Sequence, residues 1–502
     1  TNRKSRHLRK ELLKLSPEKA MDNIFVETLT TISQEILFAA GFSFSLPSES
    51  VSSVLLEQCF KEMLYSKSEF EVKYFFNFQE GIPKGSLDKI RAAISEYKRH
   101  GISPSILERE LNELRGIEAN KASDIINVYK LLNNKYLSLD LKDTGDIYNC
   151  FLSLTPEILS ESFRLLFPHV NLIVLQDFSD FSKPEINIIN SLANITKTEL
   201  FLDIDFNYSN HHLFSHLSDS IQQFSSMGFA ELNTAKVDGN LFNKFISENL
   251  FNYARPHSSD SDSITQNRCV YFSADDKTEE VTIIAKEIKG LITNEKVPPH
   301  HIGIVFNLIQ DYSPIIRDIF SSYGISFNLT DRYNLSSFSP VTTIITLLEI
   351  IETDFYYKSL FRVLSNELVR LPNVNINDIL SAASELRIIS GYKNWARCID
   401  KQIDILQKDK AEDKRIEYYN NIKAQIEHLF NLLSPFLSEM APEDFYKALE
   451  KLVVNINLPH SELIYNYESA EINLKALDTF FSTVKELLTL FSFEYPKDQK
   501  FT

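Results

Sequence analysis

The sequence is first informative through what it has little of. Its 502 residues include 12 glycines, 4 cysteines, 4 methionines and 1 tryptophan. So few glycines argue against an all-β fold with many tight turns and against glycine-rich loops. No two cysteines form a CxxC pair, so neither a zinc site nor a disulfide framework is predicted. Cysteines used this way fit a reducing, cytoplasmic compartment.

Long apolar runs and a positive net charge are also missing. No run of about 18 apolar residues occurs, so the sequence predicts no membrane-spanning helix and no membrane partner. The net charge of −16 argues against a non-specific nucleic-acid coat, although a local basic groove is compatible with it. The chain begins at Thr1 and stops at Thr502 just after a helical pattern, so we expect a fragment of a longer protein.

The hydrophobic pattern alternates between α/β and purely helical regions. Short apolar runs expected to be strands occur at residues 24–28, 171–176, 199–205, 268–273, 301–306 and 324–329. Residues rich in serine and aspartate at 251–268 predict a linker. The expected organisation is an α/β core at 1–45 and 151–250 interrupted by a helical insert at 46–150, then a second α/β core at 269–345 and a second helical region at 346–502.

The chain is organised around residues 171–182. Leu172 to Gln176 form an apolar, partly β-branched run, which predicts a parallel-sheet strand covered on both faces. Asp177 and Asp180 follow at its carboxyl end, where open α/β sheets place ligands. Pro184 then suits the first turn of a helix. The run 199–205, with a second acidic tip, completes a predicted βαβ unit.

Several phrases in this order resemble the AddB/RexB-type subunit of bacterial helicase–nucleases, a superfamily 1 helicase-like group related to PD-(D/E)XK nucleases. They are residues 95–104 and 124–130 in the first insert, 177–182 after the central strand, and 279–288, 302–306, 323–327 and 339–341 in the second core. The resemblance implies two RecA-like P-loop-type parallel-sheet cores (1A and 2A), each with a large helical insertion (1B and 2B, the latter truncated).

Measured against that family, the motifs that would hydrolyse ATP are degenerate. No GxxxxGK[ST] P-loop occurs. In the second motif, Gln176 replaces the aspartate that holds Mg²⁺, and an amide is a poorer Mg²⁺ ligand than a carboxylate. Asp177 replaces the glutamate that orients water, Ser179 replaces a glutamine, and Asp180 is retained.

The third and fourth motifs depart in the same direction. Asp205 and Tyr208 mark a third motif that has lost its glycine and its glutamine. Asn307 stands in the fourth motif where active motors place an arginine that stabilises transferred phosphate. We therefore expect an inactivated motor fold with no catalytic residue, no metal site and no cofactor in this fragment.

The acidic residues also have plainer interpretations. Asp177, Asp180, Asp203 and Asp205 are residue types that end strands and cap helices. Asp203 and Asp205 could also be read as a two-metal nuclease pair, but the Glu-x-Lys strand of that nuclease class is missing. The Pro-Glu-Asp phrase at 442–444 opens a helix, where N-capping explains it better than nuclease chemistry.

Histidine, tryptophan and arginine supply the remaining candidates. His212 and His216 share one helix face, but without a third ligand they are better explained as exposed loop residues. Trp395 is expected to pack in the second helical region, with stacking on a single strand as the alternative. An amphipathic basic helix near the amino terminus is a solvated face or, alternatively, a phosphate-contacting surface formed by Arg3, Lys4, Arg6, Arg9 and Lys10.

The resemblance implies a function in processing DNA ends during recombination repair, with single-stranded DNA and an AddA-like helicase subunit as partners. The complete protein would carry an exonuclease domain beyond residue 502, with Mg²⁺ and, as in some relatives, an iron–sulfur cluster. Two alternatives stay open. One is an active ATP-dependent translocase whose P-loop lies outside this fragment, and the other is a protein–protein scaffold that does not contact DNA.

Overall fold

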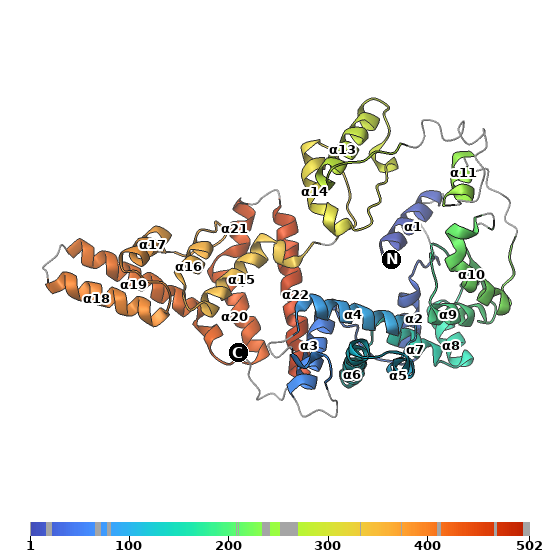
Figure 1. Ribbon diagram of the computed structural model, residues 1–502, viewed down its shortest axis with the longest axis horizontal. Coiled ribbons are helices and arrows are strands. Elements are labelled where there is room, and N and C mark those ends of the chain that lie inside the picture. Colours follow the sequence, from blue (N-terminus) through green and yellow to red (C-terminus); the bar gives the residue numbers. More distant parts are fainter. Residues whose placement is uncertain are drawn as a thin grey trace. The chain divides into compact units, whose positions relative to one another are not determined.

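The chain folds as two compact units, Thr1–Val270 and Tyr271–Thr502. The structure is a computed structural model that describes residues 2–16, 23–65, 72–77, 82–206, 208, 210–232, 241–251, 270–331, 333–372, 374–408, 413–465 and 469–494. The linker expected at 251–268 lies outside these residues, apart from Phe251. Each unit is mostly helical, as Figure 1 shows.

The first unit combines helices with a small parallel sheet. Its strands are β1 (Leu172–Leu175) and β2 (Glu199–Leu202). Its helices are α1 (Asn2–Leu15), α2 (Leu29–Ala39), α3 (Glu49–Tyr65), η1 (Phe75–Asn77), α4 (Lys84–Arg99), α5 (Pro104–Glu110), η2 (Leu111–Glu113), α6 (Ile117–Ser138), α7 (Thr144–Leu152), α8 (Pro156–Leu166), α9 (Lys183–Ala193), α10 (His211–Ser226) and α11 (Leu241–Asn249).

The described part of the second unit is helical with irregular connections. Its helices are α13 (Lys277–Thr293), η3 (Pro299–His301), α14 (Ile309–Ser322), η4 (Leu335–Ser337), α15 (Ser339–Glu352), α16 (Tyr357–Leu364), α17 (Ile376–Glu385), α18 (Tyr392–Lys408), α19 (Asp413–Leu433), η5 (Ser434–Leu437), α20 (Pro442–Asn455), α21 (Leu458–Tyr465) and α22 (Ala470–Glu494).

Local sequence explains where the helices near the sheet begin and end. Thr28 caps α2 by accepting a hydrogen bond from the Thr31 amide, and Gly41 follows the helix with a φ of +89°. That backbone conformation favours glycine after a helix. Ser182 caps α9, with Pro184 in the first turn as predicted. These signals place α2 and α9 against the sheet.

The sheet confirms the central βαβ prediction but corrects its burial. β1 and β2 pair in parallel, with Leu172 opposite Glu199 and Leu175 opposite Leu202. Ile173 and Leu175 pack on the first unit's core, whereas Leu172 and Val174 are 53% and 55% exposed. The expectation that both faces of this strand are covered is therefore wrong. An apolar run predicts the strand, but nothing in it identifies what packs on each face.

Several other predicted strands do not form among the described residues. Residues 24–28, 302–306 and 325–329 are irregular, as are 270–273 of the predicted strand at 268–273. In the second unit, Ile302, Phe306, Ile325 and Leu329 nevertheless pack against α13 and α14, while Val305 is 96% exposed. Apolar side chains alone do not make a strand, because a strand also needs a neighbour with which to exchange backbone hydrogen bonds.

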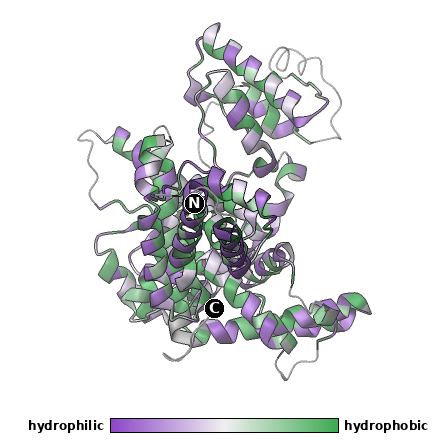
Figure 2. Ribbon diagram, turned by 90° about the vertical axis from the view of Figure 1, so that its left-hand side faces the viewer, coloured by the Kyte–Doolittle hydropathy of each residue, from purple (hydrophilic) through white to green (hydrophobic). Residues whose placement is uncertain are grey.

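Separate hydrophobic cores hold the two units together. The first unit's core includes Ile36, Phe151, Phe163 and Ile189 from α2, α7, α8 and α9. A small cluster joins α13 to α14, and a larger one fills the helical region from α15 to α22. Most helices carry both polar and apolar residues in Figure 2, as amphipathic helices do. No helix in the described ranges is long and apolar enough to cross a membrane.

Candidate functional site

The two acidic strand tips lie at one edge of the sheet. The strands run parallel, and the Asp203 amide donates to the Leu175 carbonyl at 2.8 Å, so both carboxyl ends meet. The second-motif residues follow β1 directly, and the third-motif residues follow β2. All of them have exposed side chains: Gln176, Asp177, Ser179, Asp180, Asp205 and Tyr208. The structure therefore brings the two predicted motifs to the same sheet edge.

Aromatic side chains fix the loop between β1 and α9. Phe178 and Phe181 stack with ring centroids 5.1 Å apart and planes 12° from parallel. Phe181 also meets Phe224 of α10 edge-on at 5.2 Å. Asp177 has a φ of +66°, a left-handed conformation that aspartate tolerates better than most residues. The loop is thus held by its phenylalanines, while its polar side chains stay at the surface.

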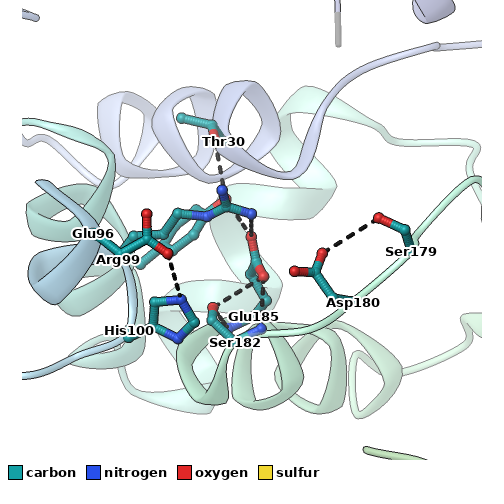
Figure 3. A network of polar contacts seen from close by, with 9 residues as sticks. Thr30, Glu96, Arg99, His100, Ser179, Asp180, Ser182 and Glu185 are labelled. Atoms are coloured by element: carbon teal, nitrogen blue, oxygen red, sulfur yellow. Dashed lines mark hydrogen bonds and ion pairs between the residues drawn. The ribbon is translucent and has the colours of Figure 1, made fainter. Parts of the chain in front are cut away.

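Polar contacts hold the same loop from the α10 side. The His216 Nε2 lies 3.0 Å from the Ser179 carbonyl oxygen, to which its N–H donates. The Tyr208 hydroxyl donates to Glu231 at 3.0 Å. Ser179 Oγ lies 3.5 Å from Asp180 Oδ1, a contact drawn in Figure 3. These bonds position the loop, but they use only protein groups as partners.

The donor groups at this edge do not fit a hydrolytic metal centre. Among the described residues, no group of three or more His, Cys, Asp or Glu side chains is placed to hold a metal ion. Gln176 offers an amide where the family's motif needs a carboxylate, and amides bind Mg²⁺ less well. The nuclease interpretation of Asp203 and Asp205 gains no further ligand, and His216 faces a backbone carbonyl instead of a metal.

Behind the loop, Glu185 joins four helices through one buried carboxylate (Figure 3). Its side chain is only 6% exposed. Its Oε2 accepts hydrogen bonds from the Ser182 amide and hydroxyl, both at 2.9 Å. Its Oε1 lies 3.3 Å from Arg99 Nη2 and 3.5 Å from the Tyr148 hydroxyl, which also bonds Thr30 at 3.0 Å. The helix that follows the loop is thereby tied to α2, α4 and α7.

Burial shapes the electrostatics of this network. Loss of solvent raises the pKa of the Tyr148 phenol above its ordinary value, the hydrogen bond from Thr30 opposes that rise, and the nearby Glu185 carboxylate adds to it. Burial lowers the pKa of Arg99, but the attraction of Glu185 outweighs that effect, so the pKa is raised. Both shifts favour a neutral phenol and a charged guanidinium beside Glu185.

A second buried ion cluster fixes α4 against α7. The Lys98 ammonium, 3% exposed, lies 2.7 Å from Asp146 Oδ2 and 3.0 Å from Asp143 Oδ2. It also sits 4.5 Å above the Tyr136 ring. A Cβ added at Gly145 would meet the Lys98 carbonyl oxygen at 2.6 Å, so the close approach of the two helices needs glycine there.

The remaining predicted residues lie elsewhere. Arg9 in α1 donates to the Val26 carbonyl at 2.6 Å and pairs with Glu27 at 2.7 Å, whereas Lys10 is exposed. The side chains of Arg3, Lys4 and Arg6 lie outside those described. Asn307 is exposed in the turn before α14, within the second unit. The phosphate-contacting interpretation of the basic helix stays a prediction.

Sequence reasoning missed the residues that hold the loop: Arg99, Tyr148, Phe178, Phe181 and Glu185. One signal was available, because Ser182-Lys-Pro-Glu185 before an apolar run is the pattern of a capping box. Both halves of that box form. Arg99 had no such signal, since it lies 86 residues before its partner Glu185.

The sequence relatives of this chain form one class, the AddB-type subunits of ATP-dependent helicase/deoxyribonucleases. No model of a known protein family matches the chain. It is 24% identical over 426 residues to the AddB-type subunit of Clostridioides difficile (strain 630), which covers 76% of this chain and 34% of that protein. It is 22% identical over 405 residues to the corresponding protein of Clostridium botulinum (strain Hall), covering 75% of this chain and 34% of that protein.

The corresponding protein of Clostridium perfringens (strain ATCC 13124) is 20% identical over 379 residues, covering 68% of this chain and 31% of that protein. These relatives confirm the predicted resemblance to AddB-type subunits. The chain spans about a third of the length of the curated relatives it matches. Its resemblance thus extends over most of its own residues and over a part of theirs.

Proposed function

We propose that this chain is a helicase-like, ATPase-inactive part of a subunit that processes DNA ends in recombination repair, in the cytoplasm. In this proposal its two units derive from RecA-like cores and their helical insertions, and they bind single-stranded DNA beside an AddA-like helicase subunit. Mg²⁺-dependent exonuclease chemistry of the PD-(D/E)XK type would belong to other parts of the complete protein.

The observation that carries the proposal is Gln176 at the end of β1. A motor of this kind needs a carboxylate there to hold Mg²⁺ against the β- and γ-phosphates. In this chain the position holds an amide, the next residue is a shortened acid, and the loop that follows is packed by Phe178 and Phe181. The helix after the loop is also fixed by Glu185 and Arg99. These features support a scaffold that keeps the fold of a nucleotide site without its chemistry.

Nucleotide and DNA binding test the proposal together. A fluorescent ATP analogue should show no Mg²⁺-dependent binding, and ATP turnover should stay at background with or without DNA. An oligonucleotide of single-stranded DNA should bind at low salt and dissociate steeply as salt rises, because phosphate contacts release counterions. Mg²⁺-dependent hydrolysis that Asp177→Ala abolishes would contradict the inactive site. No DNA binding at low salt would contradict the DNA function.

The net charge of −16 favours one competing function, a protein–protein scaffold without DNA contact. The same titration separates the two functions. A scaffold of that kind should bind neither single-stranded nor duplex DNA at about 50 mM salt, a concentration at which even a few phosphate contacts are strong.

A further inference from the structure

Positive charge in the second unit is concentrated on one helix that the motif analysis did not single out. α18 carries Lys393, Arg397, Lys401 and Lys408, and all four side chains are exposed. At 100° per residue these four positions fall on one side of the helix, opposite the buried Trp395, Ile399 and Ile403. The residues thus form a basic ridge, defined here as these four cations.

The ridge is not neutralised by the protein. None of its four cations forms an ion pair with a described residue, and Arg397 donates only to the neutral Asn394 side chain, at 2.9 Å. Asp400, at the margin of the ridge, is already paired with Lys423 of α19 at 2.7 Å. Asp404 is the one acid that lies within the ridge. Four exposed cations are thus available to an outside anion.

The buried side of α18 holds the ridge rigidly. The Trp395 indole N–H donates to the Phe355 carbonyl at 2.9 Å, and the Tyr392 ring stacks on Phe430 of α19 at 3.7 Å. α18 and α19 lie side by side in Figure 1 and share the larger core of the second unit. The cations therefore have fixed spacing, about 6 Å between Lys393, Arg397 and Lys401 at 1.5 Å per residue.

The shape and composition of the ridge favour duplex DNA over a single strand. From Lys393 to Lys408 it runs about 22 Å, a length over which one strand of a duplex presents roughly six phosphates. Proteins that hold single strands add aromatic platforms on which the bases stack. Besides its cations, the exposed side of α18 carries Asp404, Ile405 and Gln407, and no aromatic residue. Contacts to phosphate alone need a backbone that is already stiff and regular.

We propose that the basic ridge of α18 binds the phosphate backbone of duplex DNA without reading its sequence. This inference rests on the proposed function, to which it adds a specific surface and a second form of DNA. It does not involve the strand-end loop of the first unit. The two proposals can therefore fail separately.

The test compares two sets of four charge-removing substitutions in the whole chain. The ridge set is Lys393→Gln, Arg397→Gln, Lys401→Gln and Lys408→Gln. The control set removes the same charge from exposed lysines of α20 and α22 that lie among acids: Lys447→Gln, Lys451→Gln, Lys475→Gln and Lys485→Gln. Affinity for a labelled 30-base-pair duplex and for its single strand is measured by fluorescence anisotropy across salt concentrations.

We expect the ridge set to weaken duplex binding about tenfold or more and to reduce the salt slope by about three to four, since each phosphate contact contributes roughly 0.9. The control set should change the slope by less than about one. Duplexes of different sequence should lose affinity equally. Asp404→Asn, which removes the acid from the ridge, should tighten duplex binding and gives an independent result if the ridge set folds poorly.

Equal duplex binding by the ridge set and the control set, or no effect of Asp404→Asn, would overturn the inference while leaving single-strand binding and the proposed function intact. A loss confined to the single-stranded oligonucleotide would also overturn it. If the unsubstituted chain bound neither form of DNA at low salt, the DNA part of the proposed function would fail as well. Fluorescence of Trp395 during unfolding confirms that each variant keeps a folded second unit.

Discussion

Glu185 is the residue whose removal should most disturb the loop between β1 and α9. Its buried carboxylate accepts from the Ser182 amide and hydroxyl, and it faces Arg99 and Tyr148. Glu185→Ala removes the acceptor for these donors and half of the capping box. We therefore predict that the first unit is destabilised and that amides of α9 exchange hydrogen faster.

The magnitude follows from the groups left without partners. A buried donor that loses its acceptor costs about 1–3 kcal/mol, and loss of a helix cap costs about 1 kcal/mol. Part of these costs overlaps, because both involve Ser182. The Arg99 side chain is 50% exposed and regains water, so its ion pair contributes little. The expected loss is about 2–4 kcal/mol for Glu185→Ala and about 1–2 kcal/mol for Glu185→Gln, which keeps one acceptor.

Hydrogen exchange of α9 peptides across a urea series measures this loss, because it reports the first unit separately from the second. Glu161→Gln in α8 is the matched control, since that exposed glutamate should change stability by less than about 0.5 kcal/mol. An effect of Glu185→Ala no larger than the control would refute the reasoning. So would a loss in Arg99→Gln as large as the loss in Glu185→Ala.

Three other predictions concern packing and pH. Gly145→Ala should destabilise the first unit by about 3 kcal/mol, because its Cβ would overlap the Lys98 backbone, whereas Gly85→Ala in α4 meets nothing and should be neutral or stabilising; urea midpoints of the two variants decide this. Burial raises the pKa values of Tyr129, Tyr136 and Tyr148, so the folded first unit binds more protons than the unfolded chain above about pH 10. Its stability should therefore be constant near pH 8–9 and fall as pH rises above about 10, and a urea midpoint unchanged up to about pH 11.5 would contradict that. Trp395→Ala should cost the second unit about 3–5 kcal/mol, and Trp395→Phe less, about 1–3 kcal/mol for the unpaired Phe355 carbonyl, as circular dichroism during urea unfolding would measure.

Helices were the part of the fold that the sequence predicted best. α3, α4, α8 and α13 begin and end close to the expected residues, because their apolar spacing and capping residues are local signals. β1 and β2 were predicted for the same reason, as apolar runs separated by one helix. The expected strands of the second core do not pair among the described residues, since pairing depends on neighbours that no local pattern specifies.

The candidate site was predicted in position but not in detail. Parallel strands must bring Gln176 and Asp203 to one edge, so the strand-end location follows from topology. The stacking of Phe178 on Phe181 and the bond from Arg99 to Glu185 depend on tertiary packing. The sequence identified what the loop has lost, whereas the structure identified what now holds it.

The central claim, that the edge of the β1–β2 sheet keeps the form of a nucleotide site without its activity, is tested most directly by restoring the motif. Gln176→Asp with Asp177→Glu returns both acidic groups to the second motif. We predict that this double variant, like the unsubstituted chain, shows no Mg²⁺-dependent binding of an ATP analogue and no ATP turnover above background. Mg²⁺-dependent hydrolysis by either protein, lost again in Asp177→Ala, would contradict the claim.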